Sequence, residues 1–297
     1  MRSLLEIHLA VFLFGLSGLF GKLILLPAML IVLGRVVFAS AFLLLTLRYL
    51  KINIRLHHSR HYIAMAAMGI VLAVHWCAFY LSIQMSTVAI GLLTFATFPA
   101  FVTFLEPVVF QEKIRLADVA TAMAAFAGIL LVIPRFAIGD HITQGVLWGL
   151  LSGFTYAILS VLNRKYVKPY SGLTVAFYEQ LSAAIVLLAF FFWQPVEIQM
   201  RDILLLCLLG VVFTGVSHAL FINSLKHLKV QMAGIISCLE PVYGIIFAAL
   251  LLDEMPTWRE GLGGVIVLSA VFYSMVTLEQ GVTTLPPGKS EITNGGK

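Results

Sequence analysis

Three charged side chains that interrupt long apolar stretches of the sequence are the residues best suited to chemistry. Arg35, Glu179 and Glu240 each lie well inside such a stretch. A charged group inside a membrane helix costs a few kcal/mol to insert, so each is a candidate for a functional role. The planar fork of an arginine could bind a substrate carboxylate. A buried glutamate could bind an ammonium group or take up a proton.

Each of these residues also has a structural interpretation, which the sequence leaves open. Arg35 could form an ion pair, or hydrogen-bond backbone carbonyls at a helix break, instead of binding a substrate. Glu179, which Gln180 follows, could be a fixed partner of Arg35 or His75. Glu240 could hydrogen-bond a neighbouring helix.

Two prolines lie near the middle of their apolar stretches and predict helix breaks. Pro99 and Pro241 each remove a backbone hydrogen bond and free a carbonyl one turn earlier. A broken helix at mid-membrane is typical of sites for coupling ions or charged substrate groups in transporters. Glu240 directly precedes Pro241, whereas Phe98 precedes Pro99, so we expect only one break to carry a carboxylate. A kink needed for helix packing is the alternative.

Histidines and aromatic residues extend the set of candidates. His75 and His218 could relay protons, since imidazoles titrate near neutral pH, or could be hydrogen-bonded packing residues. Two histidines do not make a metal site, and the three cysteines show no CxxC spacing, so we expect neither metal nor cofactor. The aromatic residues that could line a substrate pocket, or anchor helix ends at the interface, are Trp76, Tyr80, Tyr156 and Tyr178.

The composition indicates which elements must position these residues. The 297 residues are 61% hydrophobic and only 11% charged, whereas soluble domains carry about 25% charged residues. So little polar surface predicts a chain whose solvent is lipid. The net charge of +5 does not indicate nucleic-acid binding, because the basic residues lie in short gaps between apolar segments.

Ten apolar segments are each long enough to span a hydrocarbon core of roughly 30 Å. We place these segments at 4–23, 28–49, 62–84, 87–111, 115–134, 145–164, 171–193, 203–225, 230–252 and 257–278. With a cytoplasmic N-terminus, the inner gaps and tails hold 14 Lys and Arg residues and the outer gaps hold four: Lys22, Arg135, Arg201 and Arg259. This bias predicts a multi-pass protein of the bacterial inner membrane with both termini in the cytoplasm.

An internal repeat divides the chain into two similar halves. Eight landmarks coincide after a shift of 142 positions: Phe12 with Phe154, Lys22 with Arg164, Pro27 with Pro169, Phe79 with Phe221, Ser82 with Ser224, Val88 with Val230, Pro99 with Pro241, and Glu112 with Glu254. Five helices per half is an odd number, so the halves should enter the membrane in opposite directions, which is a transporter architecture. We therefore predict repeats at 1–137 and 143–279 and a disordered cytoplasmic tail at 280–297.

The sequence resembles the drug/metabolite transporter superfamily, specifically its EamA-type members. The resemblance covers about residues 4–279 and is carried by Leu33-Gly34-Arg35, the segments 99–112 and 241–254, and Gly261-Leu262-Gly263-Gly264. It implies eight helices around a central cavity, with the fifth and tenth helices peripheral. Family members export amino acids and other metabolites, while some relatives import nutrients or exchange nucleotide sugars.

Two further groups of residues fit this architecture without adding chemistry. Glu112 and Glu254 end the fourth and ninth helices near opposite membrane faces, as structural caps or gate contacts. Gly128 and the glycines at 261, 263 and 264 permit close helix contact, within the chain or in a homodimer.

These features predict an all-α integral membrane protein that acts as a secondary transporter, with no nucleic-acid partner. The expected substrate is an amino acid or a related zwitterion or anion, moved by alternating access and exported. Proton-coupled import of a small nutrient is the alternative, since the carboxyls and histidines fit it equally well. An intramembrane enzyme is disfavoured because the sequence lacks a nucleophile elbow, an HExxH motif and a paired-Asp motif. A channel is disfavoured because no polar glycine loop resembles a filter.

Overall fold

The computed structural model describes residues 2–111, 116–133, 137, 139–166, 169–191, 197–224 and 236–283, which are helical and contain no strand. The first part of the chain forms α1 (Arg2–Ser17), α2 (Phe20–Leu23), α3 (Ala28–Tyr49), α4 (Ser59–Met85), α5 (Val88–Phe95), α6 (Phe98–Phe110) and α7 (Leu116–Val132). The second part forms α8 (His141–Tyr166), α9 (Gly172–Phe191), α10 (Met200–Gly210), the π-helix η1 (Val211–Val216), α11 (Ser217–Ser224), α13 (Leu239–Leu252) and α14 (Trp258–Thr283).

Each of the ten predicted segments contains helix among its described residues, but several are interrupted. The fourth segment divides into α5 and α6 at Ala96 and Thr97, and Pro99 lies in the first turn of α6. A proline is tolerated there because the first N–H groups of a helix have no intrahelical partner. The first and eighth segments are also divided, the eighth by η1.

Within the described residues, seven helical segments are long and apolar enough to cross a membrane, so the chain is a multi-pass membrane protein. These segments are 3–23, 28–49, 59–85, 88–109, 141–163, 172–189 and 200–221. Shorter apolar helices cover 119–132 and 239–252. Ten spans arranged as two inverted repeats remain a proposal.

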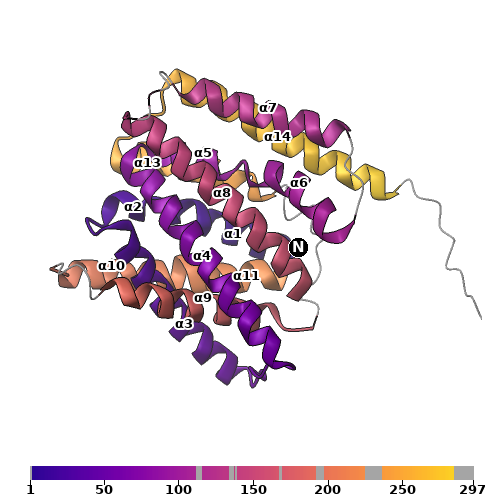
Figure 1. Cartoon of the computed structure of the whole chain (residues 1–297). Helices are drawn as coiled ribbons and strands as arrows, with labels where there is room; N and C mark the ends of the chain where they lie inside the picture. Colours follow the sequence, from indigo (N-terminus) through magenta and orange to yellow (C-terminus); the bar gives the residue numbers. More distant parts are fainter. Residues whose placement is uncertain are drawn as a thin grey trace, which may run out of the picture.

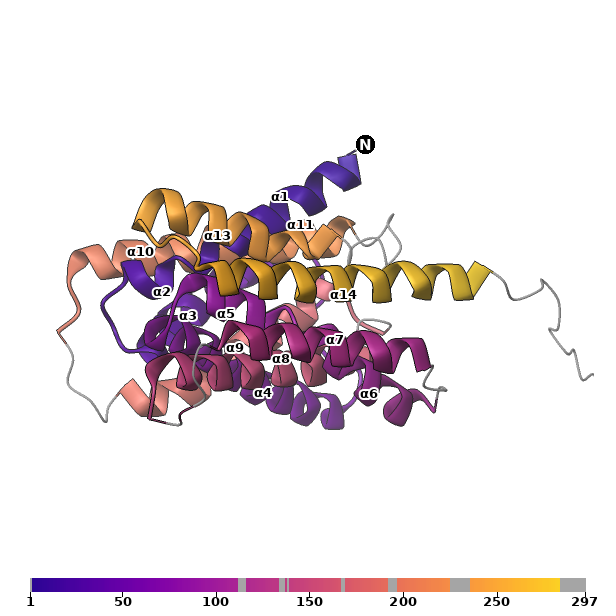
Figure 2. The ribbon, with the colours of Figure 1, turned by 90° about the horizontal axis from the view of Figure 1, so that it is seen from above.

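The helices pack side by side, and α4 contacts several of the others. α4 lies against α8 and α9, and α3 packs on α9. α1 packs on α11 and α13. Figure 2 shows α1, α11 and α13 on one side of the bundle and α4, α8 and α9 on the other. Residues on α3, α4, α8, η1 and α13 can therefore converge between these two groups.

α7 and α14 lie together along one edge of the bundle (Figures 1 and 2). Their backbones approach closely at Gly128 and Gly263. A β-carbon at Gly128 would lie 2.9 Å from the Gly263 carbonyl oxygen, and one at Gly263 would lie 2.6 Å from the Gly128 carbonyl oxygen. Small residues allow such contact between membrane helices.

Candidate functional site

Arg35 is fully buried on α3, and three neighbours define the position of its guanidinium group. The guanidinium carbon lies 3.2 Å from the centroid of the Trp76 ring, a cation–π contact. Nε donates to the Thr214 hydroxyl at 2.7 Å, and Nη1 donates to the Tyr80 hydroxyl at 3.2 Å. Nη2 has no partner among the described residues. Nη2, with its two N–H groups, is therefore available to a ligand.

Tyr80 connects this group to the first helix. Its hydroxyl accepts from Arg35 and donates to the Ser17 carbonyl at 3.1 Å. The Tyr80 side chain is fully buried, and its ring lies near that of Trp76 with centroids 6.3 Å apart. Residues of α1, α3, α4 and η1 thus meet around one guanidinium.

His75 and Trp76 form the next part of the site. His75 Nδ1 contacts Ser152 on α8, with 3.0 Å to both its hydroxyl and its carbonyl oxygen. The imidazole lies against the rings of Trp76 and Tyr156, with centroid distances of 4.7 and 4.9 Å. His75 Nε2 and Trp76 Nε1 are buried and find no partner in the described part of the chain.

Glu179 and Gln180 on α9 and Glu240 on α13 add further acceptor atoms. Glu179 and Gln180 are buried on α9, and one side-chain oxygen of each, Oε1, has no partner within the described ranges. Glu240, in the first turn of α13, is close enough to interact electrostatically with Arg35 and Tyr156. Glu179 also interacts electrostatically with Tyr156. Both carboxyls therefore lie near Tyr156, and Glu240 also lies near the guanidinium.

Pro99 and Pro241, in the first turns of α6 and α13, line a small cavity together with Glu240. Phe98, Pro99, Glu240 and Pro241 are among the residues that line it, and its volume is about 20 Å³. That volume holds about one water molecule. A metabolite needs more room, so substrate binding at this point requires the helices to move.

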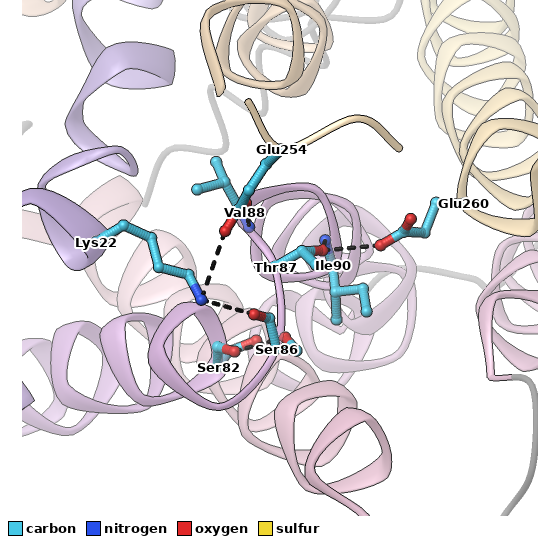
Figure 3. A network of polar contacts seen from close by, with 8 residues as sticks. All are labelled: Lys22, Ser82, Ser86, Thr87, Val88, Ile90, Glu254 and Glu260. Atoms are coloured by element: carbon cyan, nitrogen blue, oxygen red, sulfur yellow. Dashed lines mark hydrogen bonds and ion pairs between the residues drawn. The ribbon is translucent and has the colours of Figure 1, made fainter. Parts of the chain in front are cut away.

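A polar network joins the end of α2 to the α4–α5 and α13–α14 connections (Figure 3). Lys22 Nζ lies 3.5 Å from Glu254 Oε1 and donates to the Ser86 carbonyl at 2.7 Å. Glu254 also accepts from the Val88 N–H at 2.9 Å. These contacts cap the beginning of α5.

Glu260 adds a second connection in the same network (Figure 3). The Thr87 hydroxyl donates to Glu260 Oε1 at 2.8 Å, and the Thr257 N–H donates to Oε2 at 2.6 Å. Glu260 is only 4% exposed. These hydrogen bonds therefore link the beginning of α5 to the beginning of α14.

The structure brings most of the predicted site residues together, with Tyr178 apart. Arg35, His75, Trp76, Tyr80, Tyr156, Glu179 and Glu240 converge as described above. His218 contacts the Thr214 carbonyl through Nδ1 at 2.9 Å and interacts electrostatically with His75 and Arg35. The Tyr178 hydroxyl instead donates to the Ile54 carbonyl at 2.9 Å, and its ring packs on Tyr62.

Several other residues complete the comparison with the sequence. Glu254, predicted as a cap or gate contact, caps α5 through Val88. Glu112 lies outside the described residues. Thr214 and Ser152 were not predicted, although both contact predicted residues; a hydroxyl inside an apolar helix was the only available signal. Within the described ranges, no cluster of three or more His, Cys, Asp or Glu side chains could hold a metal ion.

Known proteins with similar sequences are named as transporters. An uncharacterized transporter, YxxF, of Bacillus subtilis (strain 168) is 22% identical over 99% of this chain and 93% of its own length. An uncharacterized transporter of Archaeoglobus fulgidus is 28% identical over 64% of this chain and 68% of its own length. A probable amino-acid metabolite efflux pump of Escherichia coli (strain K12) is 27% identical over 60% of this chain and 64% of its own length.

A solved crystal structure has the same fold. It superposes with a TM-score of 0.66 at 15% identity and covers 95% of this chain and 99% of its own. The sequence profile of the EamA-like transporter family matches residues 1–133 and again 143–276. This double match spans most of the chain, and the protein therefore belongs to the EamA-like transporter family.

Proposed function

We propose that this protein is a secondary transporter that exports a small zwitterionic metabolite, such as an amino acid, across the inner membrane by alternating access. One observation carries the proposal. Five buried polar atoms have no partner among the described residues: Arg35 Nη2, His75 Nε2, Trp76 Nε1, Glu179 Oε1 and Gln180 Oε1. Such an atom costs about 1–3 kcal/mol, so a ligand that pairs with several of them would bind favourably.

The types of these atoms support a zwitterion as the substrate. Arg35 Nη2 and Trp76 Nε1 can only donate, which suits a carboxylate. Glu179 Oε1 and Gln180 Oε1 accept, which suits an ammonium group. Rings such as those of Phe95 and Tyr156 offer surface to an apolar side chain.

Alternating access is supported by the position of the cavity and of the Lys22 network. The cavity lies beside Pro99 and Pro241, in the first turns of α6 and α13. The network at Lys22, Val88 and Glu254 joins the ends of these segments at the predicted outer face. We propose that this face is closed in the present conformation, and that transport requires the network to open.

Export is supported by the printed name of one relative, a probable amino-acid metabolite efflux pump. Proton-coupled import is a second candidate, because Glu179 and Glu240 place two carboxyls in the buried site. The relatives' names also suggest that the protein is not an enzyme.

Transport by the purified protein in liposomes tests the function. Labelled leucine is one zwitterionic probe, and alanine and phenylalanine extend the size range. We expect unlabelled amino acid to compete with the label, and the amine and the carboxylic acid with the same side chain to compete poorly. Equal competition by either single-charge analogue would contradict the zwitterion, and a protein that carries none of these amino acids would overturn the proposal. An imposed proton gradient distinguishes coupled import from export.

A further inference from the structure

We propose that Thr214 is a positioning residue for Arg35, and that η1 places its hydroxyl so that the guanidinium presents Nη2 to the substrate. The inference rests on the proposed function, because it assigns Arg35 a substrate contact. It states which interactions hold Arg35 in position for that contact. The side chains that carry it come from α3 and η1, 179 positions apart in the sequence.

The direction of the hydrogen bond between the two residues is fixed by the chemistry of a hydroxyl group. The single proton of Thr214 Oγ1 is donated to the Leu209 carbonyl at 2.9 Å. Its lone pairs therefore face Arg35, and Nε donates to them at 2.7 Å. Both residues are fully buried, so water cannot replace either partner without a rearrangement. Thr214 thus holds the guanidinium at Nε.

The π-helix explains why this threonine reaches Arg35. Thr46, Thr94 and Thr155 lie in α-helices, and each donates to the carbonyl four residues earlier. Thr214 instead donates to the carbonyl five residues earlier, because η1 spans Val211–Val216. A π-turn shifts the angular position of the side chains that follow it, and such turns are frequent at functional sites.

The glycine before η1 brings the two backbones close enough for the contact. A β-carbon at Gly210 would lie 2.7 Å from the Arg35 carbonyl oxygen and 2.6 Å from Phe38 Cβ. Any larger residue there would separate α3 from η1. The close approach of α3 and η1 and the π-helical geometry of η1 therefore both favour the hydrogen bond from Arg35 Nε to Thr214 Oγ1.

The contacts that hold Arg35 limit how its guanidinium can bind a substrate carboxylate. A free arginine fork binds a carboxylate through two parallel N–H groups. Here Nε is held by Thr214 and Nη1 by Tyr80, and the face of the group lies on Trp76. Nη2 remains, beside the Trp76 ring whose Nε1 also has no described partner. The site therefore presents the N–H groups of Nη2 and the indole N–H to the substrate oxygens.

The test compares Thr214→Val, which keeps the shape and removes the acceptor, with Thr214→Ser, which keeps the hydroxyl. Thr46→Val is the matched control, because Thr46 donates only along its own helix and touches no charge. Labelled leucine is the transport probe. We expect Thr214→Val to raise the KM about tenfold or more with little change in maximal rate. Thr214→Ser should restore the KM, and Thr46→Val should leave it unchanged.

A second measurement does not depend on the substrate. In a variant whose only tryptophan is Trp76, the emission of that ring reports on the guanidinium stacked against it. Thr214→Val should shift this emission and Thr214→Ser should not. Thr214→Ala, which also lacks the hydroxyl, replaces the valine variant if that variant does not fold.

The two measurements separate the possible failures. Unchanged emission in Thr214→Val would overturn the positioning role. A shifted emission with an unchanged KM would overturn the claim that the position of Arg35 matters to the substrate. A wild-type protein that carries no amino acid would overturn the proposed function, while the emission would still decide whether Thr214 positions Arg35.

Discussion

The Lys22 ammonium lies 3.5 Å from the Glu254 carboxylate, and this ion pair joins the end of α2 to the residues that follow α13. The side chains are 27% and 23% exposed. A pair with that exposure contributes about 0.2–1 kcal/mol. A contact of this strength costs little to break, as the proposed opening of this face requires, and the same two side chains also hydrogen-bond Ser86 and Val88.

Reversing either charge should open the predicted outer face. Cys238 lines the cavity, so a variant that retains only this cysteine reports access to the site. We expect Lys22→Glu and Glu254→Lys each to increase labelling of Cys238 by an impermeant maleimide added outside intact cells. The double reversal should partly restore protection, since it restores the ion pair but gives the Val88 N–H no carboxylate.

Glu197→Lys is the control for this experiment. Glu197 is exposed and belongs to the same predicted face of the membrane. Its reversal changes the surface charge equally without touching the network. Labelling that rises as much in Glu197→Lys as in Glu254→Lys would contradict a gating role for the ion pair.

Reporter fusions test the predicted inversion of the two repeats. Fusions after residues 58 and 198 should report opposite sides of the membrane, with the first in the cytoplasm. The physical reason is that residues 48–60 carry four Lys and Arg, whereas the corresponding connection after the seventh segment carries only Arg201. The same side at both positions would rule out inverted repeats.

The sequence was sufficient to predict an all-helical membrane protein and to single out polar residues that the structure brings together, because both follow from local signals. That these residues bind a substrate stays a prediction. An apolar stretch interrupted by Arg35 or Glu179 is visible without any knowledge of the fold. The contact between Arg35 and Thr214 was not predictable in this way. The segment 203–225 reads as one continuous apolar helix, and nothing in its composition marks the π-turn at 211–216.

Tyr178 was predicted as a pocket residue, but its hydroxyl lies apart from the residues around Arg35. It directly precedes Glu179, so its place in the sequence suggests the central site. Successive residues of a helix point in directions about 100° apart, and the Tyr178 hydroxyl turns to the Ile54 carbonyl instead. The direction of a side chain depends on which neighbouring helices surround it, and that requires the tertiary structure.

Substitution of Gly263 by alanine should destabilise the protein, whereas the same change at Gly261 should not. A β-carbon at Gly263 would lie 2.6 Å from the Gly128 carbonyl oxygen and from Val132, but one at Gly261 would meet nothing within 4 Å. Overpacking of this kind costs about 1–3 kcal/mol. Thermal unfolding in detergent should show a lower Tm for Gly263→Ala and an unchanged or raised Tm for Gly261→Ala. Equal values would contradict the close approach of α7 and α14.

Glu240→Gln should leave folding intact while it lowers transport or removes its pH dependence. Glu240 lines the cavity beside Pro241 and interacts electrostatically with Arg35. Glutamine keeps the size and one acceptor oxygen of the side chain, but it can neither carry a negative charge nor exchange a proton. Uptake of labelled leucine into liposomes, measured from mildly acidic to mildly alkaline pH, distinguishes these effects.

Glu260→Gln is the control for Glu240→Gln. Glu260 is acidic too and is buried, but its oxygens accept from Thr87 and the Thr257 N–H, and it does not line the cavity. Because hydrogen bonds to charged groups contribute about 1.5–3 kcal/mol, we expect this variant to lose stability while each folded molecule transports normally. If Glu240→Gln gave the same pattern, with a lower Tm and normal transport at every pH, Glu240 would be a structural residue. A normal Tm with slow or pH-independent transport in Glu240→Gln would show that the Glu240 carboxylate takes part in transport.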